Sequence, residues 1–193
     1  GNPNTGKSTL FNRLTGLRQH IANYPGITVE KKTGSLSLGG RQLELIDLPG
    51  TYSLAAASPD ERVVMDALGR RFGHQAPDLI ICVVDATNIK RNVLLVSEAA
   101  ELGIPMIIAL NQWDAAKRNG LIIDTGLLAD RLGVPVVTTV ARRGEGVEEL
   151  KKMIGHALVE PRQIPRILWP EFIESARDLV QNGLAQFDVD VTG

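Results

Sequence analysis

Apolar runs of strand length alternate with segments of helical periodicity along most of the chain. Three of these runs are continuous rather than alternating, which is typical of strands buried on both faces of a parallel sheet. They cover residues 79–84, 104–110 and 134–140. Because helix-length segments separate them, the pattern predicts βαβ units and an α/β fold with a mostly parallel sheet between helices.

Two earlier segments, residues 33–38 and 41–46, flank the dipeptide Gly39-Gly40. A glycine pair tolerates the positive φ angles of a two-residue turn, so these segments are predicted to form an antiparallel hairpin. One edge of the sheet is therefore expected to be antiparallel.

Helical periodicity and its start and stop residues predict helices over residues 7–15, 59–72, 92–102, 125–132 and 147–158. After residue 160 the pattern changes, because three prolines punctuate a linker, and residues 171–187 are predicted to form one further amphipathic helix. We therefore expect a main domain over residues 1–160. Residues 161–193 would be a linker and the start of a truncated helical domain.

The composition is that of a soluble globular domain, with 44% hydrophobic and 22% charged residues in a chain of 193. With 21 basic and 22 acidic residues, no broad positive surface is required and no nucleic-acid partner is expected. The longest apolar runs fall far short of the roughly 20 residues that cross a bilayer, and no secretory signal is recognised, so a cytoplasmic segment is expected. Cys82 lies in an apolar run and is predicted to be buried.

The first eight residues match the phosphate-binding pattern G-x-x-x-x-G-K-[ST], and the helical pattern begins at Lys7, as this motif requires. Backbone amides and the helix N-terminus bind phosphate in such a loop, the lysine reaches the β and γ phosphates, and the hydroxyl of Ser8 ligates magnesium. The predicted nucleotide-binding residues here are Asn2, Asn4, Thr5, Gly6, Lys7, Ser8 and Thr9. A phosphate loop normally follows a strand, so we expect that a first strand precedes Gly1 and is missing from this sequence.

Asp47-Leu48-Pro49-Gly50 ends the apolar segment before it and matches D-x-x-G. Alone this motif marks only a turn, but at this distance after a phosphate loop it places Asp47 near magnesium and the Gly50 amide at the γ phosphate. Between the two motifs, Thr28 is the threonine placed to bind magnesium and sense the γ phosphate. Lys7, Thr28 and Gly50 are therefore candidate catalytic residues.

The segment Asn111-Gln112-Trp113-Asp114 follows a buried run, where a guanine-specifying N-K-x-D motif belongs. Asp114 can accept hydrogen bonds from guanine N1–H and from the exocyclic amine, a pattern that adenine does not offer. Asn111 can brace the loop. Gln112 replaces the usual lysine, so we expect guanine selectivity with weakened affinity.

After the last apolar run, Val140-Ala141-Arg142 is a loose match to S-A-K. Its Ala141 amide is predicted to bind the guanine carbonyl. These three residues complete the predicted nucleotide-binding set, together with Asn111, Gln112 and Asp114. For the segment Asn111-Gln112-Trp113-Asp114, a solvated loop is the alternative.

These motifs in this order resemble the Ras-like GTPases of the translation-factor class over about residues 1–159. The finer resemblance is to the N-terminal domain of the ferrous iron transport protein B family, FeoB. It is carried by GNPNTGKSTLFN at residues 1–12, NYPGITVE at 23–30 and DLPGTYSL at 47–54. The resemblance implies a Ras-like P-loop fold, GTP/GDP and magnesium as ligands, and slow hydrolysis of GTP to GDP and phosphate.

The resemblance also implies partners and a location. In that family the domain regulates a membrane-embedded Fe(II) permease within the same protein, at the cytoplasmic face of the bacterial inner membrane. A helical domain follows it, of which this sequence would contain only the part from Glu171 onward. Homo-oligomerisation stays open.

Hydrolysis poses a separate question, because the residue after the D-x-x-G motif is Thr51, where many GTPases place a water-orienting glutamine. Thr51 is too short to act in the same way. Asn4 lies in the phosphate loop, and similar GTPases use potassium held by this asparagine, so Asn4 is a candidate catalytic residue and potassium ligand. The alternative is that Asn4 only forms the turn.

Two other functions stay open from the sequence. One is a ribosome- or RNA-associated GTPase, which shares this phosphate loop but usually carries a basic appendage. The other is a non-catalytic nucleotide-binding module that serves only for docking.

Overall fold

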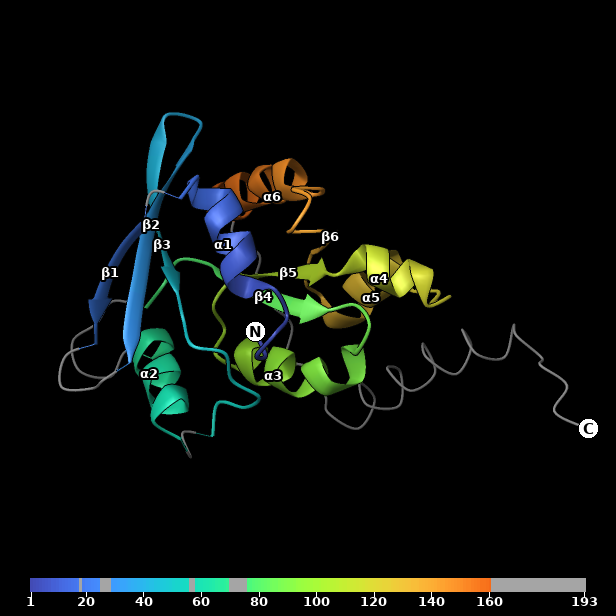
Figure 1. Ribbon diagram of the computed structural model, residues 1–193, viewed down its shortest axis with the longest axis horizontal. Helices are drawn as coiled ribbons and strands as arrows, with labels where there is room; N and C mark the ends of the chain where they lie inside the picture. The colour runs from blue at the N-terminus through green and yellow to red at the C-terminus, as the bar shows by residue number, and fades with distance from the viewer. Residues whose placement is uncertain (18, 25–28, 56–57, 70–75, 161–193) are drawn as a thin grey trace, which may run out of the picture.

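A computed structural model describes residues 1–17, 19–24, 29–55, 58–69 and 76–160 of the chain (Figure 1). The elements in chain order are α1 (Lys7–Thr15), β1 (Gln19–Asn23), β2 (Glu30–Leu38), β3 (Arg41–Asp47), α2 (Pro59–Leu68), β4 (Ile80–Asp85), α3 (Ile89–Glu101), β5 (Met106–Asn111), α4 (Trp113–Arg118), α5 (Thr125–Leu132), β6 (Val136–Thr138) and α6 (Val147–Val159). The predicted α/β fold is confirmed.

The three continuous apolar runs form a parallel sheet in the order β4-β5-β6. Every residue of the central strand β5 is buried, which explains why its sequence shows no alternation. Asp85 pairs with Asn111 at the carboxyl ends of β4 and β5. Polar side chains that follow these strands therefore meet at one edge of the sheet.

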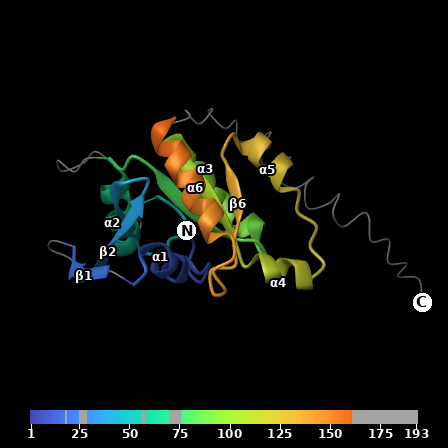
Figure 2. The ribbon, with the colours of Figure 1, turned by 90° about the horizontal axis from the view of Figure 1, so that it is seen from above.

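Helices cover both faces of this sheet: in Figure 1, α1 and α6 lie above β4 and β5, and α3 lies below them. Figure 2 shows the same arrangement from above, with α6 in front of α3. One core cluster contains Ile108 and Leu110 with apolar residues of α2, α3 and α5. The other contains Ile107 and Ala109 with apolar residues of α1 and α6. Successive residues of β5 thus alternate between two cores. Cys82 belongs to the first core and is buried, as predicted.

The predicted hairpin is also confirmed, since β2 and β3 pair antiparallel from Leu38 opposite Arg41, with Gly39 and Gly40 both at positive φ. Strand β1, which the sequence analysis did not predict, adds to the other side of β2. All five of its residues are exposed, so no buried face imposes a hydrophobic period on its sequence.

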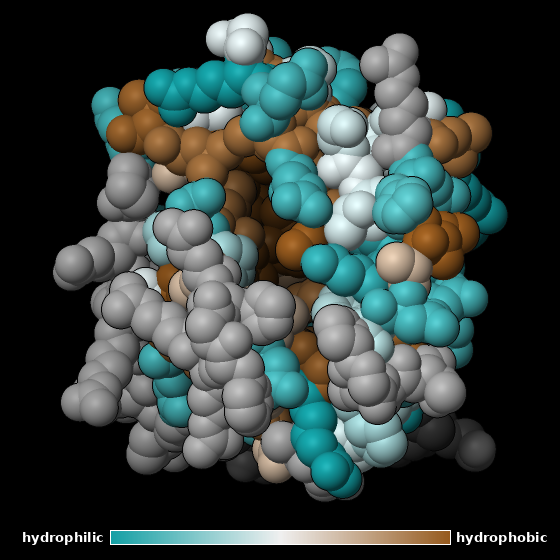
Figure 3. Space-filling model, turned by 90° about the vertical axis from the view of Figure 1, so that its left-hand side faces the viewer, coloured by the Kyte–Doolittle hydropathy of each residue, from teal (hydrophilic) through white to brown (hydrophobic). Residues whose placement is uncertain are grey.

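The described residues form two three-stranded sheets, with β1-β2-β3 separate from β4-β5-β6. Packing joins them, because Leu36 of β2 shares a core cluster with Val83 of β4. Seen from the side of the antiparallel sheet, apolar residues gather in a central hollow bordered by hydrophilic ones (Figure 3).

Several predicted boundaries differ from the structure. Helix α2 ends at Leu68, four residues before the predicted end, and α3 begins at Ile89, three residues before the predicted start. Helix α4 was not predicted, because it is only six residues long. The prediction for residues 161–193 lies outside the described part of the chain. No helix among the described residues is long and apolar enough to cross a membrane.

Candidate nucleotide-binding site

The phosphate loop enters α1 through residues in the left-handed conformation, with φ of 64° at Asn4 and 85° at Gly6. A side chain at position 6 is excluded, because a Cβ there would collide with Nδ2 of Asn111. Backbone amides in such left-handed turns, together with a helix N-terminus, form the sites that bind phosphate.

Two buried side chains hold this loop from within. The hydroxyl of Thr5 donates to the backbone carbonyl of Asn2 at 2.9 Å, and Nδ2 of Asn2 donates to the carbonyl of Arg91 in α3 at 3.1 Å. Asn2 and Thr5 therefore position the loop, and α3 supports it.

Asp47, at the end of β3, binds both functional side chains at the start of α1. The ammonium of Lys7 pairs with its Oδ1, and the hydroxyl of Ser8 donates to its Oδ2 at 2.9 Å. Thirty-nine or forty residues separate these partners in sequence. Magnesium prefers such hydroxyl and carboxylate oxygens, so Ser8 and Asp47 fit this ion. Thr28, the third predicted ligand, lies outside the described residues.

The segment after Asp47 packs directly on the phosphate loop. A Cβ on Gly50 would lie 3.0 Å from Cα of Pro3, and the amide of Thr51 donates to the carbonyl of Gly1 at 3.3 Å. This close approach is the physical reason for glycine at position 50.

Asn111 joins the two halves of the site. Its Nδ2 donates to the carbonyl of Thr5 at 2.7 Å, and its Oδ1 accepts from the hydroxyl of Thr139 at 3.1 Å and from the amide of Ala141 at 2.9 Å. The side chain therefore braces the phosphate loop against the loop after β6. The Ala141 amide, which we assigned to the guanine carbonyl, has Asn111 as its partner in this structure.

Gln112 also contacts the phosphate loop. It takes the left-handed conformation with φ of 61°, and its Nε2 donates to the carbonyl of Asn4 at 3.1 Å. The sequence predicted Gln112 as a nucleotide-binding residue that departs from the usual lysine, with no contact to the phosphate loop. This cross-loop contact depends on two segments 108 residues apart, so no local pattern could reveal it.

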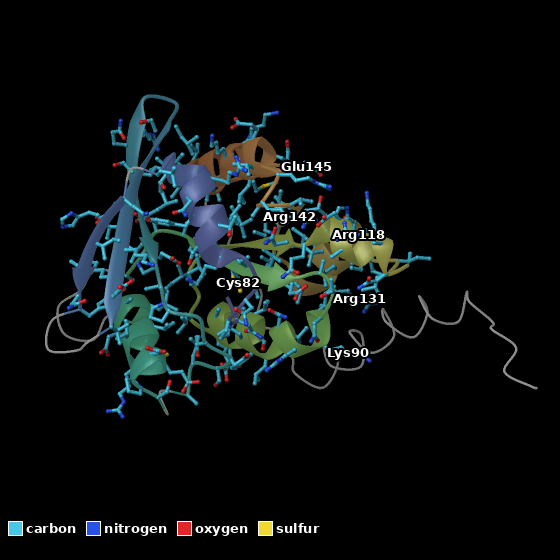
Figure 4. All side chains as sticks on the ribbon, viewed as in Figure 1. Cys82, Lys90, Arg118, Arg131, Arg142 and Glu145 are labelled. Carbon is cyan, nitrogen blue, oxygen red and sulfur yellow. The ribbon has the colours of Figure 1, made fainter. Side chains whose placement is uncertain are left out.

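Three arginines lie within 3.8 Å of Asp114. Two of them, Arg118 and Arg142, are labelled in Figure 4. Oδ2 of Asp114 accepts from Nη1 of Arg118 at 2.8 Å and also binds Arg142, while Arg143 lies 3.8 Å away. The hydrogen bond from Arg118, followed by that from Arg142, holds the pKa of Asp114 below its usual range. The carboxylate is therefore kept ionised, as an acceptor for two guanine N–H groups must be.

The loop of residues 140–142 is held by Arg13 of α1, which donates to the carbonyls of Ala141 at 3.1 Å and Arg142 at 2.6 Å. Val140 is buried and its amide donates to the carbonyl of Glu145 at 3.0 Å. Arg13, Arg118 and Arg143 were not predicted from the sequence. The spacing of Asp114 and Arg118 by one helical turn could have indicated Arg118, whereas no local pattern indicates Arg13 or Arg143.

A family model described as ferrous iron transport protein B matches residues 1–154. The chain belongs to the FeoB family.

Two curated FeoB relatives show how much of the family protein this chain represents. The Fe(2+) transporter FeoB of Salmonella typhimurium is 47% identical over 154 residues, covering 80% of this chain and 20% of the transporter. An Fe(2+) transport protein A/Fe(2+) transporter FeoB fusion protein of Porphyromonas gingivalis is 44% identical over 150 residues, covering 78% of this chain and 17% of the fusion. The chain thus spans about a fifth of the length of these relatives.

Solved FeoB structures share the fold. The cytosolic domain of the T. maritima FeoB iron transporter in a GDP form has a TM-score of 0.81 at 41% identity, covering 98% of this chain and 74% of that chain. The G domain of the same transporter has a TM-score of 0.74 at 44% identity, covering 81% of this chain and 93% of that chain. The T. maritima cytosolic domain has also been solved in a GMPPNP form.

Proposed function

We propose that this chain is the GTP-binding and GTP-hydrolysing domain of a ferrous iron transporter. The observation that carries the proposal is the position of Asn111, whose side chain bonds Thr5 of the phosphate loop and Ala141 of the base-side loop at once. Groups suited to phosphate and groups suited to guanine therefore belong to one site. The FeoB structures solved with GDP and GMPPNP support the same ligand class.

On the phosphate side, Lys7 binds the β and γ phosphates and exchanges its contact with Asp47 for them. Ser8 and Asp47 would hold magnesium, together with Thr28. When bound, this ion supplies the positive charge that neutralises the phosphates during transfer. The amide of Gly50 binds the γ phosphate, because the contact of Gly50 with Pro3 brings this amide next to the phosphate loop.

On the base side, Asp114 accepts the two guanine N–H groups and rejects adenine, whose edge offers a different pattern. Its ionised state and its contact with Arg118 orient it for this purpose. Ala141 supplies an amide to the guanine carbonyl after releasing Asn111. Val140 supports this loop from the core, and Arg142 lines the site through its contact with Asp114.

Hydrolysis uses no glutamine after Gly50. We propose that Asn4, exposed in the phosphate loop, holds a potassium ion beside the bridge between the β and γ phosphates. Turnover should then be slow, and faster in potassium than in sodium at equal ionic strength. Asn4→Ala should abolish that difference and lower the rate at least about tenfold; equal rates of the unmodified chain in the two salts would refute the potassium site.

The primary test is parallel titration with labelled GTP and ATP, followed by phosphate release over many turnovers. We expect GTP to bind selectively and Asp114→Ala to remove the selectivity. Equal affinity for the two nucleotides would refute the guanine assignment. GTP binding without phosphate release would leave a docking module instead of an enzyme.

The transport connection rests on the relatives, which are named Fe(2+) transporters. We propose that this domain regulates the Fe(II) permease portion of the same full-length protein, at the cytoplasmic face of the bacterial inner membrane. In cells that express the full-length protein, Lys7→Ala should lower ferrous iron uptake without changing protein amount. The RNA-associated alternative gains no support, because the matched relatives are iron transporters.

A further inference from the structure

Helix α3 holds the segment that follows the D-x-x-G motif. The carboxylate of Glu98 accepts from the hydroxyl of Ser53 at 2.9 Å through one oxygen and from the amide of Leu54 at 2.6 Å through the other. The connection from β3 to α2 runs past α3 at this point (Figure 1). Both oxygens of one side chain thus bind two consecutive residues of this connection.

The bonded segment continues toward the phosphate loop. The hydroxyl of Thr51 donates to the carbonyl of Ser53 at 2.6 Å, and the amide of Ser53 lies 3.3 Å from that hydroxyl oxygen. The amide of Thr51 in turn donates to Gly1 at 3.3 Å. A continuous series of hydrogen bonds therefore connects Glu98 with the backbone next to Gly50.

A second contact on the same face of α3 supports this arrangement. The guanidinium of Arg91 lies 4.5 Å from the centre of the Tyr52 ring. Arg91 and Glu98 are seven residues apart, which places them on one side of a helix. The carbonyl of Arg91 also accepts from Asn2 of the phosphate loop. Helix α3 thus binds the phosphate loop and residues 52–54 together.

The amide of Leu54 depends on Glu98 as its hydrogen-bond acceptor. Leu54 is buried in the core, so its amide cannot exchange Glu98 for water without moving. Among the described residues, the side chain of Glu98 makes its hydrogen bonds to Ser53 and Leu54 and none to the phosphate loop, to Asp47 or to the base-side residues. Its influence on these groups is carried by Ser53 and Thr51.

We propose that Glu98 is a positioning residue for GTP hydrolysis, which holds Ser53 and Leu54 so that the backbone of Gly50 and Thr51 faces the γ phosphate. This inference rests on the proposed GTPase function. It assigns Glu98 a part in turnover and no part in nucleotide affinity, because the groups that bind diphosphate and base do not depend on its side chain.

The test compares variants of the full chain by multiple-turnover hydrolysis at saturating GTP and by equilibrium binding of labelled GDP. For Glu98→Ala we expect kcat to fall about tenfold, because small misplacement of reacting groups is costly. GDP affinity should stay within about twofold of the unmodified chain, since the variant removes no group of the phosphate loop.

Glu98→Gln provides the rescue. Its carbonyl oxygen can accept from Leu54 and its amide can donate to the Ser53 hydroxyl, which turns to accept. We therefore expect kcat of this variant within about threefold of the unmodified chain. Leu94→Ala is the matched control, because Leu94 lies on the same helix with 46% of its surface exposed and should change neither quantity.

Ser53→Ala removes the hydrogen bond between the Ser53 hydroxyl and Glu98 but keeps the one from the Leu54 amide. It therefore tests the positioning role of Glu98 without leaving a buried amide unpaired. Its kcat should fall by less than that of Glu98→Ala, and it should have no further effect when Glu98 is already alanine. Unchanged kcat in both variants, loss of kcat and affinity together, or failure of Glu98→Gln to rescue would overturn the proposal. An unmodified chain that does not hydrolyse GTP would instead refute the proposed function, and the inference with it.

Discussion

The phosphate half and the base half of the site are built in different ways. In the phosphate half, Lys7 and Ser8 bind one acceptor, Asp47. These contacts form among residues of two short motifs. Their position follows from the left-handed backbone at Gly6, which favours glycine, and from the close approach of Gly50 to Pro3, which leaves no room for a side chain.

In the base half, by contrast, side chains from separate loops determine the arrangement. Asp114 binds Arg118 on its own helix and Arg142 from a loop 28 residues later, and both arginines are more than half exposed. Exposed ion pairs are individually weak and are screened by salt. In the proposed site, the phosphate half is thus fixed by backbone geometry, whereas the base half depends on exchangeable side-chain contacts.

The largest effect should come from breaking the backbone geometry of the phosphate half. In Gly6→Ala the new Cβ meets Asn111 and the residue must also keep φ at 85°, so we expect loss of nucleotide binding and unfolding free energy lower by more than about 2 kcal/mol. Gly16→Ala is the matched control, because Gly16 has φ of 61° but open space around it. Denaturant unfolding should show a clearly smaller loss for Gly16→Ala; equal losses would contradict the collision.

The next largest effect should come from a substitution that removes the connection between the two halves. Asn111→Ala leaves the Ala141 amide and the Thr5 carbonyl unpaired in the interior, so we expect a loss of about 1–3 kcal/mol of stability and weaker binding of both GDP and GTP. Thermal unfolding and nucleotide titration measure these effects. Gln112→Ala removes a single cross-loop hydrogen bond, so it should lower stability and nucleotide affinity less than Asn111→Ala does. A greater loss in Gln112→Ala would mean that Gln112, and not Asn111, is the main connection between the two halves.

A smaller effect, of opposite sign, is expected from Arg142. Arg118 and Arg142 both bind Oδ2 of Asp114, so guanine must displace one of these donors. Arg142→Ala should therefore raise GDP affinity by about threefold, and added salt should narrow the difference from the unmodified chain. Arg143→Ala is the control, because the guanidinium of Arg143 lies 3.8 Å from Oδ2 of Asp114. This variant should change GDP affinity little. Weakened GDP binding in Arg142→Ala would mean that this arginine supports the base and does not compete with it.

The smallest effect concerns pH. The folded pKa of Asp114 lies below its ordinary value of 3.8, chiefly through Arg118, so its contribution to stability is present above about pH 4 and is lost as pH falls toward the lowered pKa. We expect the difference in unfolding free energy between the unmodified chain and Asp114→Asn to be constant near neutrality and to shrink below pH 4. A difference that grows on acidification would contradict this sign.

Local patterns were sufficient for most of the fold. Continuous apolar runs predicted the strands of the parallel sheet, and the glycine pair predicted the β2–β3 hairpin. Strand β1 escaped prediction because an edge strand with every residue exposed has no hydrophobic period. Its antiparallel pairing with β2 holds it in the extended conformation, which its own sequence does not indicate.

The site is likewise divided into residues that local sequence patterns predict and residues that only the tertiary contacts reveal. The sequence by itself determined the phosphate loop, Asp47, Gly50, Asn111 and Asp114 as candidates, because each lies in a short motif whose spacing reflects backbone geometry. Only the tertiary structure decided that Arg13 holds the 140–142 loop, that Gln112 contacts Asn4 and that Glu98 binds Ser53 and Leu54. These contacts join residues 44 to 128 positions apart, and such a distance carries no local signal, since the contacts form only when the folded chain brings helices α1 and α3 next to loops that are remote in the sequence.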